Sequence, residues 1–343
     1  MNGRNEVFES ELRRLAQEAS VLPEETHWLD EHRDPTEAAV VRSLAAQVAA
    51  QHGGDLSRMR RALGMSNATW VGGGLAVRIA NTPLVDDMAA EVALVRALPP
   101  EVGHPRILGA GTTEGHHWLV AEEVQGQNLH EAWSTLTPEE RGRAIRQLWA
   151  RARVVHDATP SLRLLVGSQS GFIPTPDDAT AAAVRVSSAL GLADVQRSRL
   201  HEIIGAYYRA APVVEQVVNH GDLALMNALW DGEVVALLDF EFAVLGPVEI
   251  DLCRLVCEAL VSEDGHSTDP DAVAVAFAIA ARDGDPVHGR ALLHGAAVLD
   301  QLRDLEIWLA RARTDDRFED WRPDRLLTGL LDADGGYLAP ALT

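Results

Sequence analysis

Lysine is absent from this sequence of 343 residues, and every basic side chain is an arginine or a histidine. Schiff-base formation and the phosphate-binding P-loop both require a lysine ammonium group. The lack of lysine therefore excludes these two kinds of chemistry. It also makes an arginine at a functional position less informative than it would be in a chain that uses both residues.

Cysteine is almost as scarce, because Cys253 and Cys257 are the only two and lie one helical turn apart. Two thiols at that spacing do not make a zinc site, and a reduced pair inside the core is the simpler interpretation. No stretch approaches the roughly 18 apolar residues of a membrane-spanning helix. The start, Met1-Asn2-Gly3-Arg4, lacks the apolar segment of a secretory signal. We therefore expect a cytoplasmic protein that does not bind a membrane.

Positive charge is also in short supply. The chain has 30 basic residues against 51 acidic ones, and its formal net charge is −21 at pH 7. Binding of nucleic acid or of an anionic membrane depends on a basic surface, so both partners are disfavoured. A cationic small molecule would suit this charge, but so would a merely acidic, soluble surface. The choice between a monomer and a homodimer stays open.

The informative stretch is Val217–Leu252, in which acidic residues follow apolar runs. His220-Gly221-Asp222 ends the first run. Asp231-Gly232, a dipeptide typical of a type I′ turn, joins the next two runs into a predicted hairpin. Because Asn227 precedes this hairpin and Asp239 follows it, we expect both side chains on the same side as Asp222.

Phosphoryl transfer requires a set of oxygen-bearing side chains of this kind. One carboxylate orients the attacking hydroxyl, while an asparagine and a second carboxylate hold Mg²⁺ against the phosphate oxygens. The interval from Asp222 to Asn227 equals that between the base and the asparagine of kinase catalytic loops. A surface hairpin with ordinary turn aspartates would explain any one of these residues, but not their spacing together with both strands.

Three motifs resemble the aminoglycoside phosphotransferase family: His-Gly-Asp-Leu-x-x-x-Asn, Leu-Leu-Asp-Phe-Glu and Gly-Pro-x-Glu-x-Asp-Leu. This family is the small-molecule branch of the protein-kinase-like fold, which also includes choline kinases. The resemblance implies that Asp222 is the catalytic base and that Asn227 and Asp239 bind Mg²⁺. It further implies that Asp251 is a buried carboxylate that steadies the catalytic loop, and that His220 is structural.

The resemblance also implies an α+β, two-lobed protein-kinase-like fold, with a small antiparallel-sheet N-lobe and a mainly helical C-lobe. We expect an N-terminal helical extension at 1–54, a nucleotide-binding N-lobe at 55–125 that ends at the hinge, and a C-lobe at 126–343 with the catalytic loop and the substrate site. Helix signals at 5–17 and 34–53 make up the extension. These helices brace the N-lobe or form a dimer contact.

Further candidates for nucleotide binding lie in the expected N-lobe. A Gly-Met-Ser-Asn segment resembles the turn that covers the nucleotide, so Ser66 and Asn67 are expected near the phosphates. Arg78 stands where the family has its phosphate-pairing base, and an arginine can fork onto two phosphate oxygens. The resemblance makes Glu91 the partner that orients Arg78; a solvated helix glutamate is the alternative.

The expected hinge includes Glu122 and Val124. There the backbone groups, not the side chains, would bond the nucleotide base. The sequence therefore leaves ATP and GTP as equal candidates for the phosphoryl donor.

Evidence for the substrate is thin. Asp300, Asp304 and Trp308 fall on one stripe of a predicted helix, which could receive an amine or a sugar ring; a solvated acidic face with a packed tryptophan is the alternative. Glu241 lies in an Asp-Phe-Glu segment that looks more like choline kinase than like protein kinases. It could reach a second Mg²⁺ or be solvated.

The sequence thus predicts an O-phosphotransferase that moves the γ-phosphoryl group of ATP or GTP to a hydroxyl of a small natural product. An antibiotic is the leading class, namely an aminoglycoside, a macrolide or a capuramycin-type nucleoside, and resistance is the expected role. A metabolic kinase for choline, ethanolamine or an amino sugar is the main alternative. A regulatory nucleotide-binding pseudokinase and an Mg²⁺-dependent hydrolase are two others.

Overall fold

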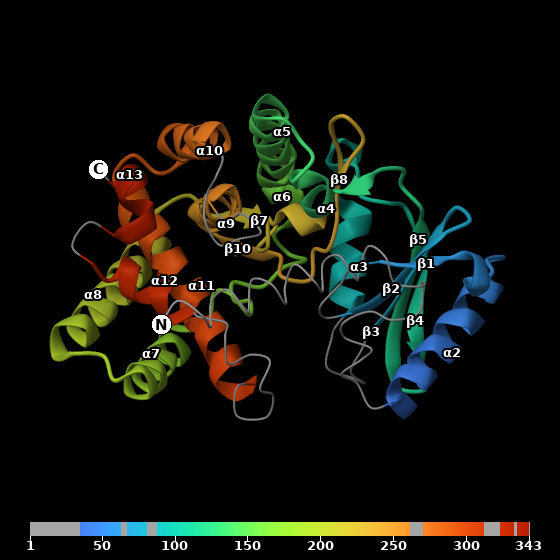
Figure 1. The fold of residues 1–343 in the computed structure, drawn as a ribbon, viewed down its shortest axis with the longest axis horizontal. Coiled ribbons are helices and arrows are strands. Elements are labelled where there is room, and N and C mark those ends of the chain that lie inside the picture. Colours follow the sequence, from blue (N-terminus) through green and yellow to red (C-terminus); the bar gives the residue numbers. More distant parts are fainter. Residues whose placement is uncertain are drawn as a thin grey trace. The chain divides into compact units, whose positions relative to one another are not determined.

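The computed structural model describes residues 35–62, 67–80, 88–260, 270–311, 323–332 and 335–342. They form two compact units, of which the first ends at Gly126 and the second also includes Pro99–Val102. The first unit contains a small antiparallel sheet and the second is mainly helical, as the α+β prediction requires (Figure 1). The predicted helix at 5–17 lies outside the described residues.

The sheet of the first unit has five strands in the order β1-β2-β3-β5-β4. Every neighbouring pair is antiparallel. The strands are β1 (Arg60–Arg61), β2 (Asn67–Gly72), β3 (Leu75–Ala80), β4 (Ile107–Thr113) and β5 (His116–Glu122). A short 3₁₀ turn, η1 (Leu56–Arg58), precedes β1.

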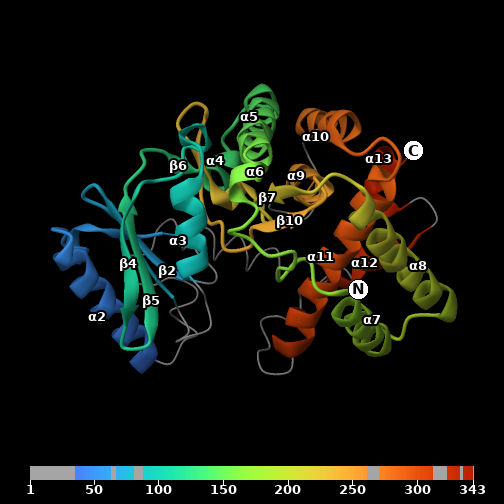
Figure 2. The same cartoon turned by 180° about the vertical axis from the view of Figure 1, so that it is seen from behind.

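Two helices, α2 (Pro35–Gln51) and α3 (Met88–Ala97), cover opposite faces of this sheet (Figure 2). The alternation of side chains along β5 shows why. Val120 belongs to the core cluster under α2, whereas its neighbours Leu119 and Ala121 belong to the cluster under α3. Successive strand residues point to opposite faces. Since α2 is part of this core, it braces the sheet, which was one of the two roles expected of it.

Local sequence explains the tight β2–β3 hairpin. Gly72 pairs with Leu75, so the loop consists of Gly73 and Gly74 alone. Both have positive φ, +64° and +86°. A two-residue type I′ turn needs such values, and glycine adopts them without steric cost.

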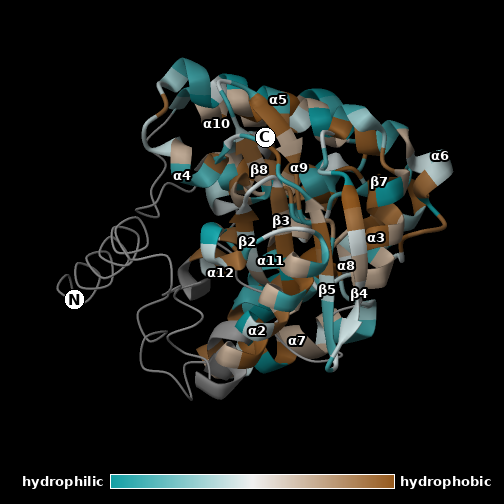
Figure 3. Ribbon diagram, turned by 90° about the vertical axis from the view of Figure 1, so that its right-hand side faces the viewer, coloured by the Kyte–Doolittle hydropathy of each residue, from teal (hydrophilic) through white to brown (hydrophobic). Residues whose placement is uncertain are grey.

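The second unit is built mainly from helices, and local sequence explains where some of them begin. For example, Thr137 and Glu140 form a capping box at the start of α5, whose first residue is Pro138. This helix carries both hydrophilic and hydrophobic residues, as its two colours in Figure 3 show. The helices are α4 (Leu129–Trp133), α5 (Pro138–Asp157), α6 (Thr159–Leu162), α7 (Pro176–Leu190), α8 (Asp194–Ala210), α9 (Glu249–Leu260), α10 (Pro270–Asp283), α11 (Gly289–Arg311), α12 (Pro323–Leu330) and α13 (Ala339–Leu342).

Two small antiparallel sheets accompany these helices. One has the order β6-β8-β9 and the other pairs β10 with β7. Their strands are β6 (Gln127–Asn128), β7 (Val217–Asn219), β8 (Ala228–Trp230), β9 (Val234–Leu237) and β10 (Val244–Gly246), and the 3₁₀ turns are η2 (Pro100–Val102), η3 (Ala211–Val213), η4 (Leu225–Asn227) and η6 (Gly336–Leu338).

The predicted β8–β9 hairpin is present, but its turn differs from the type I′ expectation. Trp230 pairs with Val234, so three residues form the loop. Gly232 has a φ of +76°, whereas the φ of Asp231 is not positive. A type I′ turn requires positive φ at both central residues, and a three-residue loop needs it only at the glycine.

Helix α11 lies at the centre of the helical unit, where α7, α8, α9 and α12 pack against it (Figures 1 and 2). Its contact with α8 is close, because a Cβ added to Gly295 would lie 2.4 Å from Cβ of Tyr207. A larger residue there would push the helices apart. Within the described part of the chain, no helix is long and apolar enough to span a bilayer.

Candidate active site

The loop that follows β7 carries the predicted base. Gly221 precedes Asp222 and has a φ of +85°. A Cβ at this position would lie 1.9 Å from the carbonyl oxygen of Phe242. The backbone of the loop therefore passes directly beside the segment after β9, and a side chain at position 221 cannot be accommodated without moving one of them.

Asp251, at the start of α9, fixes this loop from beneath. Its carboxylate accepts hydrogen bonds from the N–H groups of His220 and Gly221, each at 2.9 Å, and lies 2.9 Å from Nε2 of His156. Burial alone would raise the pKa of Asp251, but these hydrogen bonds and the nearby histidines lower it below its ordinary value. An ionised carboxylate thus holds the loop that carries Asp222 in place.

The predicted metal ligand Asn227 touches the predicted base. Its Nδ2 donates to the backbone oxygen of Asp222 at 2.9 Å and to Oδ2 of the same residue at 3.0 Å. Since the amide nitrogen is used in this way, Oδ1 of Asn227 is the atom that could bind a cation. The carbonyl of Asn227 also accepts from N–H of Leu238 at 2.8 Å, which links the loop to the residue before Asp239.

Asp239 has a φ of +63°, one of two positive values among the described non-glycine residues. Aspartate tolerates this conformation better than most residues, and such outliers cluster at functional sites. His220 supports the same segment: its Nε2 lies 2.8 Å from the carbonyl oxygen of Leu238, and its ring lies 4.4 Å from that of Phe240. These contacts account for His220 structurally. Glu241 is half-buried in the turn that follows.

The donor set at the end of the hairpin fits Mg²⁺. Asn227 and Asp239 offer an amide and a carboxylate oxygen, which a hard cation prefers. No group of three or more His, Cys, Asp or Glu side chains in the described ranges could hold a metal by itself. Mg²⁺ usually keeps water and phosphate oxygens as ligands, so two protein ligands agree with a site completed by the nucleotide.

An arginine that was not predicted from the sequence also contacts Asp222, the predicted base. Nη2 of Arg254, on α9, lies 2.7 Å from Oδ1 of Asp222 and 3.6 Å from Oε1 of Glu258. Nη1 of Arg254 lies 3.2 Å from Oδ2 of Asp300. The sequence contains one signal for this cluster, because Asp251, Arg254 and Glu258 follow each other at steps of three and four and so share a helix face.

Four residues were predicted as weak substrate contacts, namely Glu241, described above, and the three on the α11 stripe. Of these three, Asp300 is part of an internal ion cluster. Asp304 lies one turn further along α11 with its carboxylate 3.3 Å from Arg303. Burial, followed by the charge of Asp300, raises the pKa of Asp304 to about 7. The side chain of Trp308 lies outside the part that the structure describes.

In the first unit, the structure brings together Arg78 and Glu91. Nη1 of Arg78, on β3, donates to both carboxylate oxygens of Glu91 at 2.9 and 3.1 Å. Both side chains are largely buried. The predicted partner of the phosphate-pairing arginine is therefore next to it.

The other predicted nucleotide-binding residues are less informative. Asn67 is buried at the start of β2, and Ser66 lies outside the described residues. At the expected hinge, Glu122 pairs with Arg106 on the surface. Glu123 bonds to Gly74 twice, through its backbone N–H at 3.0 Å and its carboxylate at 2.8 Å. The chain at Val124 is thus tied to the β2–β3 turn.

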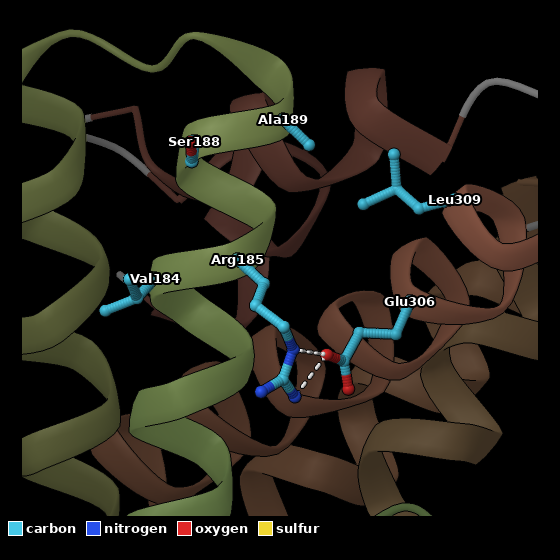
Figure 4. A pocket seen from close by; sticks show the side chains of 6 residues that line it. All are labelled: Val184, Arg185, Ser188, Ala189, Glu306 and Leu309. Carbon is cyan, nitrogen blue, oxygen red and sulfur yellow. Dashed lines mark hydrogen bonds and ion pairs between the residues drawn. The ribbon is translucent and has the colours of Figure 1, made fainter.

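A groove of about 570 Å³ lies between α7 and α11 (Figure 4). The ion pair of Arg185 and Glu306 crosses it. Apart from this pair, its walls are small or apolar, namely Val184, Ser188, Ala189 and Leu309. None of the predicted site residues lines this groove.

Comparison with known proteins agrees with this geometry. A model of the phosphotransferase enzyme family matches residues 57–294. The search of curated proteins gives no match. Solved structures of other proteins also match most of this chain. Their sequence identities are below 25%, so this similarity shows the fold alone.

Three of these structures are enzymes or enzyme-family proteins. Aminoglycoside phosphotransferase APH(4)-Ia, solved as a thermostable mutant with ADP and hygromycin B, is 16% identical with a TM-score of 0.58 and covers 83% of this chain and 98% of its own. The macrolide 2'-phosphotransferase MphH from Brachybacterium faecium is 18% identical with a TM-score of 0.55 and covers 82% and 96%. A choline/ethanolamine kinase family protein from Mesorhizobium loti is 18% identical with a TM-score of 0.59 and covers 89% and 99%.

These findings confirm the resemblance inferred from the three motifs and the protein-kinase-like fold. Because the family model spans more than half of the chain, the protein belongs to the phosphotransferase enzyme family.

Proposed function

We propose that this enzyme transfers the γ-phosphoryl group of ATP or GTP to a hydroxyl group of a small natural product in the cytoplasm. The observation that carries the proposal is the 3.0 Å contact between Nδ2 of Asn227 and Oδ2 of Asp222. It places a candidate base beside a candidate metal ligand, on a loop fixed by Asp251. Phosphoryl transfer depends on this kind of positioning, because the acceptor hydroxyl must attack in line with the leaving group.

In this mechanism, a carboxylate oxygen of Asp222 orients the acceptor hydroxyl and receives its proton. When bound, Mg²⁺ neutralises the charge of the phosphate oxygens, and Oδ1 of Asn227 with the carboxylate of Asp239 would hold it. Arg78 would bind phosphate oxygens through its guanidinium group, which Glu91 orients. The chain thus supplies positioning and charge rather than covalent chemistry.

An antibiotic is the leading acceptor class, and resistance is the role we propose. Aminoglycosides and macrolides are candidate acceptors because similar structures are named as phosphotransferases of these compounds. A capuramycin-type nucleoside is the third candidate within this class. The partner is a small hydroxylated molecule, and the enzyme acts as a monomer or a homodimer.

A metabolic kinase for choline, ethanolamine or an amino sugar is the second candidate. It is favoured by the Asp-Phe-Glu segment that includes Glu241 and by the similar choline/ethanolamine kinase family structure. A regulatory pseudokinase is disfavoured, because Asp222, Asn227 and Asp239 are all present. An Mg²⁺-dependent hydrolase would release phosphate to water without needing an acceptor.

A mass-spectrometric acceptor screen tests the proposal. Purified enzyme, Mg²⁺ and ATP or GTP are mixed with aminoglycosides, macrolides, nucleoside antibiotics, choline and amino sugars. We expect a gain of one phosphate on one class. Phosphate release without any acceptor would favour the hydrolase, and no nucleotide binding would contradict the kinase function.

Asp222→Asn is the decisive variant in this screen. We expect its turnover to fall by about 10²- to 10⁴-fold, because it can no longer receive the proton. Asp231→Asn is the matched control, since it removes the same charge from the exposed β8–β9 turn. If Asp222→Asn transferred phosphate as fast as the control, Asp222 would not be the base.

A further inference from the structure

The guanidinium group of Arg254 contacts two carboxylates through different nitrogens. One guanidinium nitrogen, Nη2, lies 2.7 Å from Oδ1 of Asp222, and the other, Nη1, lies 3.2 and 3.4 Å from the two oxygens of Asp300. The arginine comes from α9 and Asp300 from α11, so two helices fix its position. Its side chain is 18% exposed and that of Asp222 is 14% exposed. Water therefore weakens this contact less than it would at the surface.

Aromatic packing restricts the same guanidinium further. Cζ of Arg254 lies 5.2 Å from the ring centre of Phe172, and Cζ of Arg303 lies 3.7 Å from that ring. The ring of Phe242 meets that of Phe172 edge to face at 4.8 Å. Stacking on an aromatic face favours a planar guanidinium over a lysine ammonium group. Arg254 is thus confined by packing as well as by charge.

Both oxygens of the candidate base are then accounted for. Oδ2 of Asp222 accepts from Asn227, whereas Oδ1 faces Arg254. The Oδ1 contact is close, but its angle departs from that of a hydrogen bond, so it acts as an ion pair. A carboxylate oxygen has two lone pairs, and Oδ1 can still accept a hydrogen bond from an acceptor hydroxyl.

We infer that Arg254 is a positioning residue that fixes the orientation of the Asp222 carboxylate during phosphoryl transfer. The inference rests on the proposed function, since it assumes that Asp222 is the base. Without Arg254, Asn227 alone would hold the carboxylate. Asp222, Glu258 and Asp300 would also repel one another, because Arg254 is the cation that lies between them. Small misplacements of a catalytic group cost large factors in rate.

The test compares four variants of the full-length enzyme. Arg254→Met removes the charge, Arg254→Lys keeps it without the fork, and Asp300→Asn releases one end of Arg254. Arg303→Met is the matched control, because Arg303 stacks on the same ring and lies against Asp304. Turnover is measured with Mg·ATP and Mg·GTP, using water as the acceptor and then the acceptor that the screen identifies. Nucleotide dissociation constants are measured alongside.

We expect Arg254→Met to lower kcat by about 10- to 100-fold, with the nucleotide dissociation constant changed less than about twofold. Arg254→Lys should recover part of this loss, Asp300→Asn should lose less than Arg254→Met, and Arg303→Met should stay within about twofold of the wild type. The loss in Arg254→Met combined with Asp300→Asn should be smaller than the product of the single losses, because both act through one contact.

A crystal structure of Arg254→Met gives a readout that does not depend on turnover. We expect the Asp222 carboxylate to rotate or lose a defined orientation, while the bonds from Asp251 to the loop remain. If Arg254→Met does not fold, the same structural comparison is made with Arg254→Lys. An unchanged Asp222 carboxylate with unchanged kcat would overturn the inference. Full activity of Asp222→Asn would instead contradict the proposed base itself, so the two failures are distinguishable.

Discussion

The two units use a buried arginine in opposite ways. In the first unit, one nitrogen of Arg78 donates to both oxygens of Glu91, so a carboxylate fixes an arginine. In the second unit, Arg254 lies among three carboxylates and one of them is Asp222, so an arginine fixes a carboxylate. The proposed chemistry explains the difference. Phosphate oxygens need an oriented cation, whereas an acceptor hydroxyl needs an oriented base.

The comparison also has an energetic side. Removing one partner of a buried ion pair is costly, because the remaining charge stays buried without compensation. In a cluster with several carboxylates, one of them can be lost while the arginine keeps other partners. The loss of Asp300 alone should therefore be partly compensated, because Asp222 and Glu258 still contact Arg254.

Among the variants that probe this comparison, Gly221→Ala should have the largest effect, and it tests whether the backbone helps to place Asp222. The added Cβ would lie 1.9 Å from the carbonyl oxygen of Phe242, so the loop must move and turnover should fall by about 100-fold or more. Gly232→Ala is the control, because its φ is also positive but no atom lies within 4 Å. It should cost only about 1–2 kcal/mol, measured by urea unfolding. If Gly232→Ala lowered turnover as much as Gly221→Ala does, the close approach to Phe242 would not be the cause of the loss.

The next effect concerns Glu91→Gln, which breaks the pair of the first unit. Arg78 would lose a charged contact that is buried, so the free energy of unfolding should fall by about 3 kcal/mol. Nucleotide affinity should fall as well, because the guanidinium is no longer oriented. Calorimetry with Mg·ATP and Mg·GTP measures the second effect. Asp300→Asn should lower the free energy of unfolding by a smaller amount, because Arg254 keeps its contacts with Asp222 and Glu258. A larger loss than in Glu91→Gln would contradict this expectation.

Surface pairs provide the reference for this experiment. Arg106 and Glu122 form an ion pair whose side chains are well exposed. Water and salt screen such a pair, so Glu122→Gln should leave the unfolding midpoint unchanged within error.

A pH dependence should come from Asp304. Its pKa is about 7 in the folded protein, raised first by burial and then by Asp300, against an ordinary value of 3.8. Between these values the folded state holds a proton that the unfolded state has lost. The free energy of unfolding should therefore fall as the pH rises from about 4 to 7, by at most about 1.4 kcal/mol per pH unit. Asp304→Asn should flatten this slope, whereas the exposed Asp157→Asn should not. A slope that persists in Asp304→Asn would exclude this carboxyl as its source.

The sequence predicted the parts of the site that are local. Asp222 and Asn227 are in contact, and Asp239 follows Leu238, whose N–H bonds to Asn227, so their spacing was informative. The hairpin was predicted correctly, but its type I′ turn was wrong, because Asp-Gly also fits a loop of three residues. The family resemblance, and not helix periodicity, predicted the Arg78–Glu91 pair.

The parts that depend on tertiary packing were missed. His156 reaches Asp251 from the end of α5, and nothing in the helix pattern distinguishes it from a surface histidine. Arg254 meets Asp222 because α9 lies beside the loop after β7, and Asp300 on α11 contacts the other nitrogen of Arg254. Asp300 was predicted as a substrate residue because it shares a stripe of the helix with Asp304 and Trp308. In the structure, Asp300 contacts Arg254 on the neighbouring helix α9. Periodicity gives the face of a helix, not what covers it.

Helix α11 contributes both to the Arg254 cluster, through Asp300, and to the groove with α7, through Glu306. Six residues separate them, or about 9 Å along the helix axis. A single rigid helix therefore supports both places. Substitutions on α11 that reshape the groove would therefore also disturb the surroundings of Asp222. Changes at Val184, Ser188 or Ala189 on α7 could alter the groove and leave that support untouched, which makes α7 the wall at which this enzyme can diversify.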